Sequence, residues 1–137
     1  MLVSVGILAR FIHPTEAFHG DLGVISEEDI MIFISNNGNS SELLQLIPGL
    51  KERRVKIYAM TAKSTSPLAL QSQFVLSLPP VAELCPLKQA PITSTITSLA
   101  LCQLLVASCI ESRHFTLEEY AKNHPGGSIG KRIFFLE

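Results

Sequence analysis

The chain has 137 residues, of which 47% are hydrophobic, and its formal net charge is −1. This length allows one domain with its own core and no second domain. Charges of both signs are scattered along the sequence, so no basic patch attracts nucleic acid or an anionic membrane. The three cysteines, Cys85, Cys102 and Cys109, are odd in number and lack C-x-x-C spacing. This argues against a disulfide framework or a zinc site and is typical of a reducing, cytoplasmic compartment.

The first eleven residues, MLVSVGILARF, are mostly apolar. They lack the basic start and the cleavage site of a signal peptide. We interpret them as the later part of a secondary-structure element, and we expect an edge strand that ends at Phe11 and Ile12. A polar loop is expected to follow from His13.

Strands and helices then alternate. Residues 29–35 form a nearly continuous apolar run, which is typical of a strand buried on both faces of a parallel sheet. A turn at residues 36–39 ends this strand, and a helix follows, with Asn39 and Glu42 at the spacing of a capping box. Pro48 is expected to end or kink that helix. The next predicted elements are a strand at 55–60, a short helix at 64–70 and a strand at 74–78.

A long helix is predicted at residues 92–112. The segment from Gln89 to Ile110 has no charge and is long enough to span a bilayer. Its first third is nevertheless rich in hydroxyl groups, which a spanning helix would have to bury in lipid. A core helix whose N-terminus meets a polar ligand explains this gradient better, so no membrane is expected. Beyond it, Thr116 and Glu119 predict a capping box and a short helix that stops before Pro125.

This alternation predicts an α/β fold, a three-layer α/β/α sandwich with a parallel sheet of about four strands. Ligands of such sheets bind beyond the carboxyl ends of the strands. Residues 35–42 occupy such a position, where a glycine turn and a helix N-terminus offer free N–H groups and a positive dipole to an anion, most often phosphate. An ordinary helix cap has the same composition, so the local pattern leaves both interpretations open. The side chains that would hold the anion are Ser35, Asn36, Asn37, Ser40 and Ser41.

Four segments carry more specific patterns. Residues 13–23 read HPTEAFHGDLG, residues 35–42 read SNNGNSSE, residues 83–95 read ELCPLKQAPITST, and residues 124–130 read HPGGSIG. In this order they resemble the motifs of the arabinose-5-phosphate isomerases, which contain a sugar isomerase (SIS) domain. The resemblance covers nearly the whole chain and implies a flavodoxin-like or Rossmann-like parallel sheet.

The resemblance implies roles for four titratable residues. Glu83 and His124 match acid/base candidates, with His124 reaching the pocket of a neighbouring subunit. Glu42 would take part in the active site, and His19, near Asp21, could serve a proton relay. Each has an ordinary alternative, namely a helix cap for Glu42 and His124, a solvated loop carboxylate for Glu83 and a turn residue for His19. The hydroxyl-bearing residues that would contact the sugar or phosphate are Thr93, Ser94 and Thr95.

The chain also departs from the family pattern. Family members have a Gly-x-Gly-Lys-Ser-Gly segment before the His-Pro motif and two CBS repeats after the SIS domain. We expect this chain to lack both, and therefore to have little isomerase activity by itself. Asn37 and Asn39 stand where Ser and Glu are usual. Lys88 stands where Gly is usual. It could offer a cation to a substrate, but we interpret it as a solvated side chain.

The expected function is isomerisation of D-ribulose 5-phosphate to D-arabinose 5-phosphate for Kdo and lipopolysaccharide synthesis. No cofactor is expected, and no metal, because His13 and His19 form no complete ligand set. The alternative is a catalytically impaired sugar-phosphate-binding module, either regulatory or a remnant. A pure oligomerisation domain leaves the polar loops unexplained. The resemblance also implies a homo-oligomer, a dimer of dimers.

Overall fold

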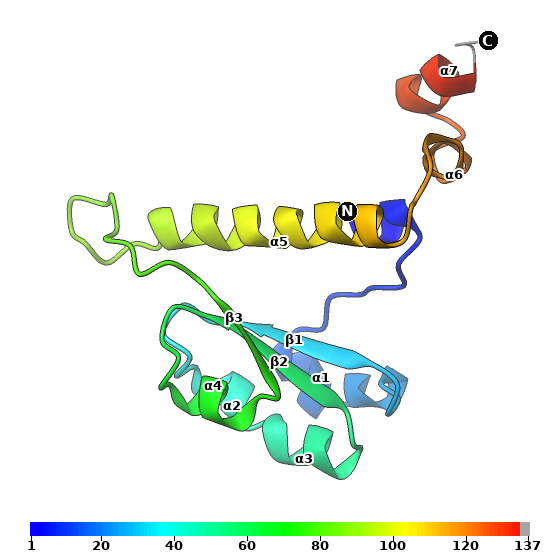
Figure 1. The fold of residues 1–137 in the computed structure, drawn as a ribbon. Coiled ribbons are helices and arrows are strands. Elements are labelled where there is room, and N and C mark those ends of the chain that lie inside the picture. The colour runs from blue at the N-terminus through cyan, green and yellow to red at the C-terminus, as the bar shows by residue number, and fades with distance from the viewer. Residues whose placement is uncertain (135–137) are drawn as a thin grey trace. The chain divides into compact units, whose positions relative to one another are not determined.

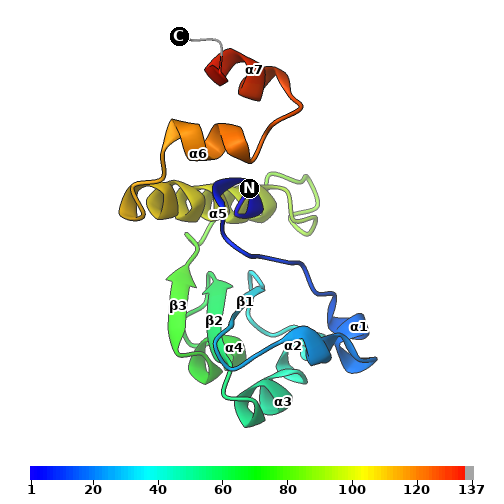
Figure 2. The same cartoon turned by 90° about the vertical axis from the view of Figure 1, so that its right-hand side faces the viewer.

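Three apolar runs form the parallel sheet that the sequence predicts. The computed structural model describes residues 1–134 (Figure 1). Strands β1 (Ile30–Ile34), β2 (Lys56–Thr61) and β3 (Phe74–Ser77) lie in the order β1-β2-β3, and both pairings are parallel (Figure 2). Ile34 pairs with Met60 and Thr61 pairs with Ser77, so the carboxyl ends of all three strands lie at one edge. The α/β fold is therefore confirmed, with three strands in the described residues where about four were expected.

The expected edge strand at Phe11 and Ile12 is wrong. The chain is irregular there, and β1 pairs only with β2 within the described residues. The segment after it was expected to be a loop but contains α1 (Pro14–Phe18) and a 3-10 helix, η2 (Asp21–Val24). Pro14 fits the first turn of α1, where the missing N–H costs nothing, and His13 Nδ1 accepts a hydrogen bond from Thr15 N.

The chain divides into two compact units, which are described separately. One contains residues 12–98, and the other contains residues 1–11 with the chain from Leu99 onward. The core of the first unit joins β1 and β2 to its helices, through Phe33, Ile57, Ile47, Leu50 and Leu68. Its remaining helices are α2 (Ser41–Leu44), α3 (Ile47–Glu52) and α4 (Pro67–Gln71).

Strand β1 was expected to be buried on both faces, but within the described residues the structure buries only one of them. Phe33 is 4% exposed and faces the core of its unit, whereas Ile30, Ile32 and Ile34 are 39–50% exposed. Side chains alternate between the faces of a strand, so the core covers one face of β1 and leaves the other face accessible.

The helix after β1 begins and breaks differently from the prediction. Its N-cap is Ser40, without a side-chain capping bond, so the expected capping box of Asn39 and Glu42 does not form. The helix is interrupted between α2 and α3, and Pro48 lies in the first turn of α3. The predicted break at Pro48 is therefore confirmed, because proline is tolerated in the first turn but not in the middle of a helix.

The second unit contains η1 (Val3–Val5), most of α5 (Thr93–Ser112), α6 (Leu117–Lys122) and α7 (Ser128–Phe134). Arg113 donates a hydrogen bond to the carbonyl oxygen of Val5, and Asn123 donates one to that of Ser4. The predicted capping box of Thr116 and Glu119 is present at the start of α6. These bonds tie the first residues of the chain to the segment around α6.

Within residues 1–134, α5 has the length and the apolar composition of a membrane span. Of an apolar stretch of 18 residues within this helix, 11% is buried. Length and composition are weak criteria for a single helix, because the core helices of globular proteins meet them too. The absence of a membrane interaction remains a prediction.

Candidate active site

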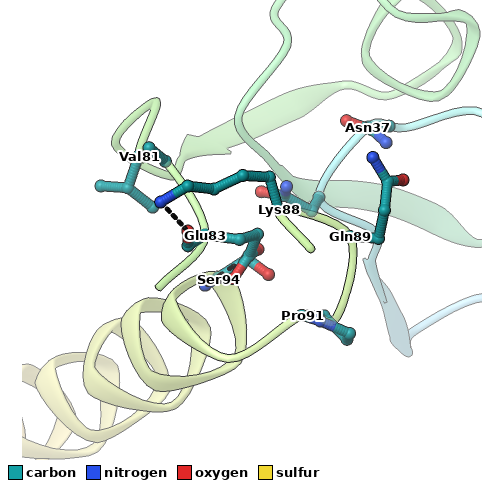
Figure 3. A pocket seen from close by; sticks show the side chains of 9 residues that line it. Asn37, Val81, Glu83, Lys88, Gln89, Pro91 and Ser94 are labelled. Carbon is teal, nitrogen blue, oxygen red and sulfur yellow. Dashed lines mark hydrogen bonds between the residues drawn. The ribbon is translucent and has the colours of Figure 1, made fainter. Parts of the chain in front are cut away.

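Two loops at the carboxyl edge of the sheet form the candidate site. We call residues 35–40, which follow β1, the β1 loop, and residues 78–92, which follow β3, the β3 loop. Residues from both loops, with Ser94 of α5, line a pocket of about 490 Å³. All of them belong to one unit, residues 12–98. The lining residues are Asn36, Asn37, Val81, Ala82, Glu83, Lys88, Gln89, Pro91 and Ser94 (Figure 3).

The β1 loop is fixed by hydrogen bonds to its neighbours in the sheet. Asn36 O accepts bonds from Ala62 N and from Thr61 Oγ1, both at 3.0 Å. Ser35 Oγ and Ser40 Oγ lie 2.9 Å apart, so one hydroxyl donates to the other across the turn. The turn itself needs glycine, because Gly38 has φ +60° and an added Cβ would lie 2.1 Å from Ser66 Oγ. These contacts fix the loop that carries Asn36 and Asn37, which line the pocket.

The β3 loop is fixed mainly by the first turn of α5. The Glu83 carboxylate accepts hydrogen bonds from Thr93 N at 2.7 Å and from Ser94 N at 3.3 Å. Glu83 therefore caps a helix that begins ten residues later. Leu84 N donates to Thr93 Oγ1 at 3.0 Å, which adds a second bond between this loop and the helix.

These contacts keep Glu83 ionised. An interaction with the Ser94 side chain contributes most to lowering the pKa of Glu83, and the backbone N–H groups of Thr93, Ser94 and Ile92 lower it further, against the opposing effect of desolvation. A carboxylate with a lowered pKa is a weaker base, but it is fully deprotonated at neutral pH. Glu83 is thus ionised at neutral pH and poorly suited to begin a reaction as an acid, and its affinity for a proton is lower than that of an ordinary carboxylate.

Cys85 lies in the same loop and is buried. The backbone N–H groups of Ala90, Gln89 and Leu87, in that order, lower the pKa of its thiol, although desolvation opposes them. Lys88 N also donates to Cys85 O at 2.8 Å and closes a turn at residues 85–88.

The hydroxyl-bearing residues predicted at the start of α5 are oriented differently from one another. Ser94 is 3% exposed and lines the pocket. Thr93 Oγ1 is used by Leu84 N, and Thr95 Oγ1 donates to the carbonyl oxygen of Pro91. Of the three predicted ligands, Ser94 is the one among the lining residues.

The residues that line this pocket do not include the other predicted site residues, namely Ser35, Ser40, Ser41, Glu42, His19 and His124. Glu42 is exposed on α2 and accepts a hydrogen bond from Ser41 Oγ at 3.2 Å. His19 is exposed at the end of α1, with Nδ1 at 2.8 Å from Thr15 O. His124 belongs to the other unit, where Nδ1 lies 2.8 Å from Tyr120 O and the ring packs on Tyr120 at 4.2 Å. Their catalytic roles remain predictions.

Sequence reasoning did not select Lys88 and Gln89 as site residues, although both line the pocket. Lys88 Nζ donates to Glu83 O at 3.2 Å, and Figure 3 shows its side chain extended along Glu83. The available signal was position, since both residues follow the carboxyl end of a predicted parallel strand. Within the described residues no three His, Cys, Asp or Glu side chains cluster as metal ligands.

Comparison with known proteins gives a consistent result. The family described as "SIS domain" matches residues 2–108. The arabinose 5-phosphate isomerase GutQ of Escherichia coli K12 is 42% identical over 132 residues, which is 96% of this chain and 41% of GutQ. The Salmonella typhimurium LT2 protein of the same name is 41% identical with the same coverage. The chain thus spans about two fifths of the length of these curated relatives.

Solved structures share the fold. A protein of Escherichia coli CFT073 in complex with arabinose 5-phosphate superposes with a TM-score of 0.87 at 31% identity, covering 90% of this chain and 66% of that one. A Bacteroides fragilis structure gives a TM-score of 0.85 at 38% identity, covering 92% of this chain and 67% of that one. This chain therefore has the same fold as these two solved structures.

Proposed function

This chain belongs to the SIS domain family, and from that premise we propose that it forms the sugar-phosphate site of an aldose-ketose isomerase. The proposed reaction converts D-ribulose 5-phosphate to D-arabinose 5-phosphate, without a cofactor, for Kdo and lipopolysaccharide synthesis. The name of the GutQ relatives and the arabinose 5-phosphate bound to a similar structure support the choice of sugar.

The observation that carries this proposal is the composition of the pocket. The β1 loop offers the amides of Asn36 and Asn37, the β3 loop offers the Glu83 carboxylate, and α5 offers Ser94. Amide and hydroxyl donors suit the oxygens of a phosphate or a sugar. A deprotonated carboxylate beside them suits removal of a proton from carbon. Both requirements of a sugar-phosphate isomerase therefore meet in one place.

The chemistry requires a base at the carbon-bound proton and an acid at the carbonyl oxygen as an enediol forms. We assign Glu83 as the base, because its ionised carboxylate lines the pocket. His124 is assigned as the acid, reaching the pocket of a neighbouring subunit. Glu42 and His19 take supporting proton-transfer roles. The phosphate grip on Ser35, Asn36, Asn37, Ser40 and Ser41 supplies orientation rather than chemistry.

The proposal includes the setting in which the site operates. The protein is cytoplasmic, forms a dimer of dimers and binds neither nucleic acid nor a membrane. The assignment of His124 to a neighbouring subunit requires that assembly. Apolar side chains on α5 such as Ile96, Leu99 and Leu104, each 58–62% exposed, support burial against another chain.

A second function is a sugar-phosphate-binding module without catalysis. It is favoured by the state of Glu83, whose oxygens already accept hydrogen bonds from Thr93 N and Ser94 N. A carboxylate serving as a helix cap can be structural alone. The two functions make the same prediction for binding and opposite predictions for turnover.

The test measures both properties on the purified chain. Calorimetry with arabinose 5-phosphate is expected to detect binding, and Ser40→Glu is expected to abolish it by placing a negative charge at the anion. Gln71→Glu, at an exposed position of α4 outside the pocket lining, is the matched control. Conversion of ribulose 5-phosphate, compared between this chain and the same chain with the family's Gly-x-Gly-Lys-Ser-Gly segment added, then separates an isomerase from a binding module. Wild-type protein that binds no sugar phosphate contradicts both functions.

A further inference from the structure

We propose that the Lys88 ammonium binds the phosphate group of the sugar phosphate. The inference rests on the proposed function of the pocket and adds a residue that determines its ligand. Lys88 lines the pocket beside Asn36, Asn37 and Ser94. Its Nζ atom is placed over the β3 loop by a hydrogen bond to Glu83 O (Figure 3).

The charges of the pocket are the first reason. Lys88 and Glu83 are the two charged residues among its lining residues. The Glu83 carboxylate faces the N–H groups of Thr93 and Ser94, so the helix end compensates its charge. The ammonium of Lys88 donates its hydrogen bond to a carbonyl oxygen, which is neutral. Lys88 therefore carries the positive charge in this lining that is available to attract an anionic ligand.

The neighbouring donors complete a site for an anion. Asn36, Asn37, Gln89 and Ser94 all line the pocket with Lys88. Three amide groups and one hydroxyl can donate to phosphate oxygens, and an ammonium supplies the charge that neutral donors lack. Exchange of the exposed bond to Glu83 O for a charged bond to phosphate is favourable, because charge-assisted hydrogen bonds are stronger than neutral ones.

The backbone of Lys88 is the second reason. Its φ is +55°, in the left-handed region that favours glycine. The other two non-glycine residues with positive φ within residues 1–134 are Arg54 and His114. Both follow a helix, and the next residue in each case bonds back five positions, from Val55 N to Leu50 O and from Phe115 N to Ile110 O. This is a standard helix ending.

Lys88 ends no helix. It closes the turn at residues 85–88, where glycine would meet the same conformation without strain. A lysine at a strained position that opens into a pocket is expected where its side chain is needed, because strained residues concentrate at functional sites. The backbone and the charge thus point to the same residue.

The experiment compares wild type with three variants. Lys88→Arg keeps the charge, Lys88→Met removes it but keeps most of the side chain, and Lys88→Gly removes both charge and strain. Lys63→Met is the matched control, because Lys63 is an exposed lysine lining the adjoining pocket that shares Asn36 and Asn37. The probes are arabinose 5-phosphate, unphosphorylated arabinose and inorganic phosphate, titrated by calorimetry at low and high salt.

Lys88→Met is expected to weaken arabinose 5-phosphate binding about 10-fold at low salt, from the usual strength of a charged hydrogen bond. Lys88→Arg is expected to stay near wild type, and Lys63→Met to weaken binding less. The salt dependence of affinity should flatten in Lys88→Met. Binding of unphosphorylated arabinose should not change between variants. Lys88→Gly should lose affinity as Lys88→Met does, yet melt roughly 2–4 °C above it as the strain is released.

The outcomes separate this inference from the proposed function. Sugar-phosphate binding that is equal in wild type and Lys88→Met overturns the role of Lys88 and leaves the proposed function intact. Equal losses in Lys63→Met and Lys88→Met also overturn it. They would show that positive charge near the pocket attracts the anion in general, without a specific contact to Lys88. Binding of inorganic phosphate that depends on Lys88, without binding of arabinose 5-phosphate, supports the Lys88 site and overturns the proposed substrate. Wild type that binds none of the probes overturns both.

Discussion

The β1 loop and the β3 loop line the same pocket but are held in different ways. The β1 loop is tied to β2 and to α4. Asn36 O accepts bonds from Thr61 Oγ1 and from Ala62 N, and Gly38 O accepts one from Leu68 N of α4. The β3 loop is tied to α5, through the carboxylate of Glu83 and the hydroxyl of Thr93.

This difference separates two tasks. The β1 loop depends on buried groups, since Thr61 and Ser66 are each 1% exposed. It can present neutral donors at fixed positions. The β3 loop contributes the charged residues Glu83 and Lys88, both with exposed or half-exposed side chains. We therefore expect substitutions at the buried anchors of the β1 loop to act on stability, and substitutions of the charged residues of the β3 loop to act on ligand charge and proton transfer.

The largest expected effect is on turnover and comes from the β3 loop. In a sugar-phosphate isomerase built on this site, Glu83→Gln should lower the rate of ribulose 5-phosphate conversion about 10²–10⁴-fold, the usual contribution of a general base. Glutamine can still accept a hydrogen bond from Thr93 N, so the melting temperature and the affinity should change much less.

Glu119→Gln is the matched control for this substitution. The pKa of Glu119 is also lowered, first by the backbone N–H of Thr116, but Glu119 caps α6 and lies outside the pocket lining. Near-normal turnover in Glu83→Gln would remove the base assignment and reduce Glu83 to a helix cap.

The second prediction concerns stability and the β1 loop. Gly38→Ala should destabilise the fold by about 3 kcal/mol, since a Cβ at φ +60° is strained and would meet the buried Ser66 side chain. Chemical denaturation measures the change. Gly20→Ala, at φ +128° with nothing within 4 Å of the added Cβ, isolates the strain without the clash. Equal losses in both variants would show that the loop does not depend on its packing against Ser66.

The third prediction compares the two anchoring hydroxyls. Thr61→Val removes a buried hydroxyl that donates to Asn36 O, and it should cost about 1 kcal/mol. Thr93→Val removes the acceptor of Leu84 N at an exposed position, where water can replace it, so a smaller loss is expected. Denaturation curves of the two variants test this order, with the exposed Thr65→Val as the control. A larger loss of unfolding free energy in Thr93→Val than in Thr61→Val would show that the β3 loop has the stronger anchor of the two.

Local patterns explain which features could be predicted from the sequence. The strands at residues 30–34, 56–61 and 74–77 are apolar runs between turns, and the capping box of Thr116 and Glu119 joins residues only three apart. The apolar run of β1 did not reveal that one face would remain exposed, because burial depends on what packs against each face.

The site was less predictable because its key contacts are not local. Glu83 caps a helix that starts ten residues later, a distance that no capping rule covers. The Asn39–Glu42 spacing suggested a cap that does not form, since the helix begins after Ser40, whose hydroxyl lies against Ser35. Lys88 was interpreted as solvated, and neither its left-handed backbone nor its place in the pocket lining could be read from the sequence. The roles of Glu42, His19 and His124 remain predictions.

The smallest expected effect is the pH dependence of the Glu83 cap. The pKa of Glu83 is lowered in the folded state, so the ionised carboxylate stabilises the fold at pH values above the ordinary carboxyl pKa of 4.5. This stabilisation is lost as the pH falls through the lower, folded-state pKa. The melting temperature of wild type should therefore exceed that of Glu83→Gln by a nearly constant margin from pH 7 to 5, on the order of 1–3 °C.

Below pH 4.5 that margin should shrink towards zero, because protonated Glu83 and glutamine are similar acceptors for Thr93 N. Glu119→Gln should follow the same course, since the pKa of Glu119 is lowered by its own helix cap. Glu52→Gln, at the exposed end of α3, is the control for a change of surface charge. A margin for Glu83→Gln that persisted unchanged to pH 3 would mean that the N–H groups of α5 do not hold this carboxylate ionised. The β3 loop would then be anchored by Thr93 alone, and the contrast with the buried anchors of the β1 loop would become greater.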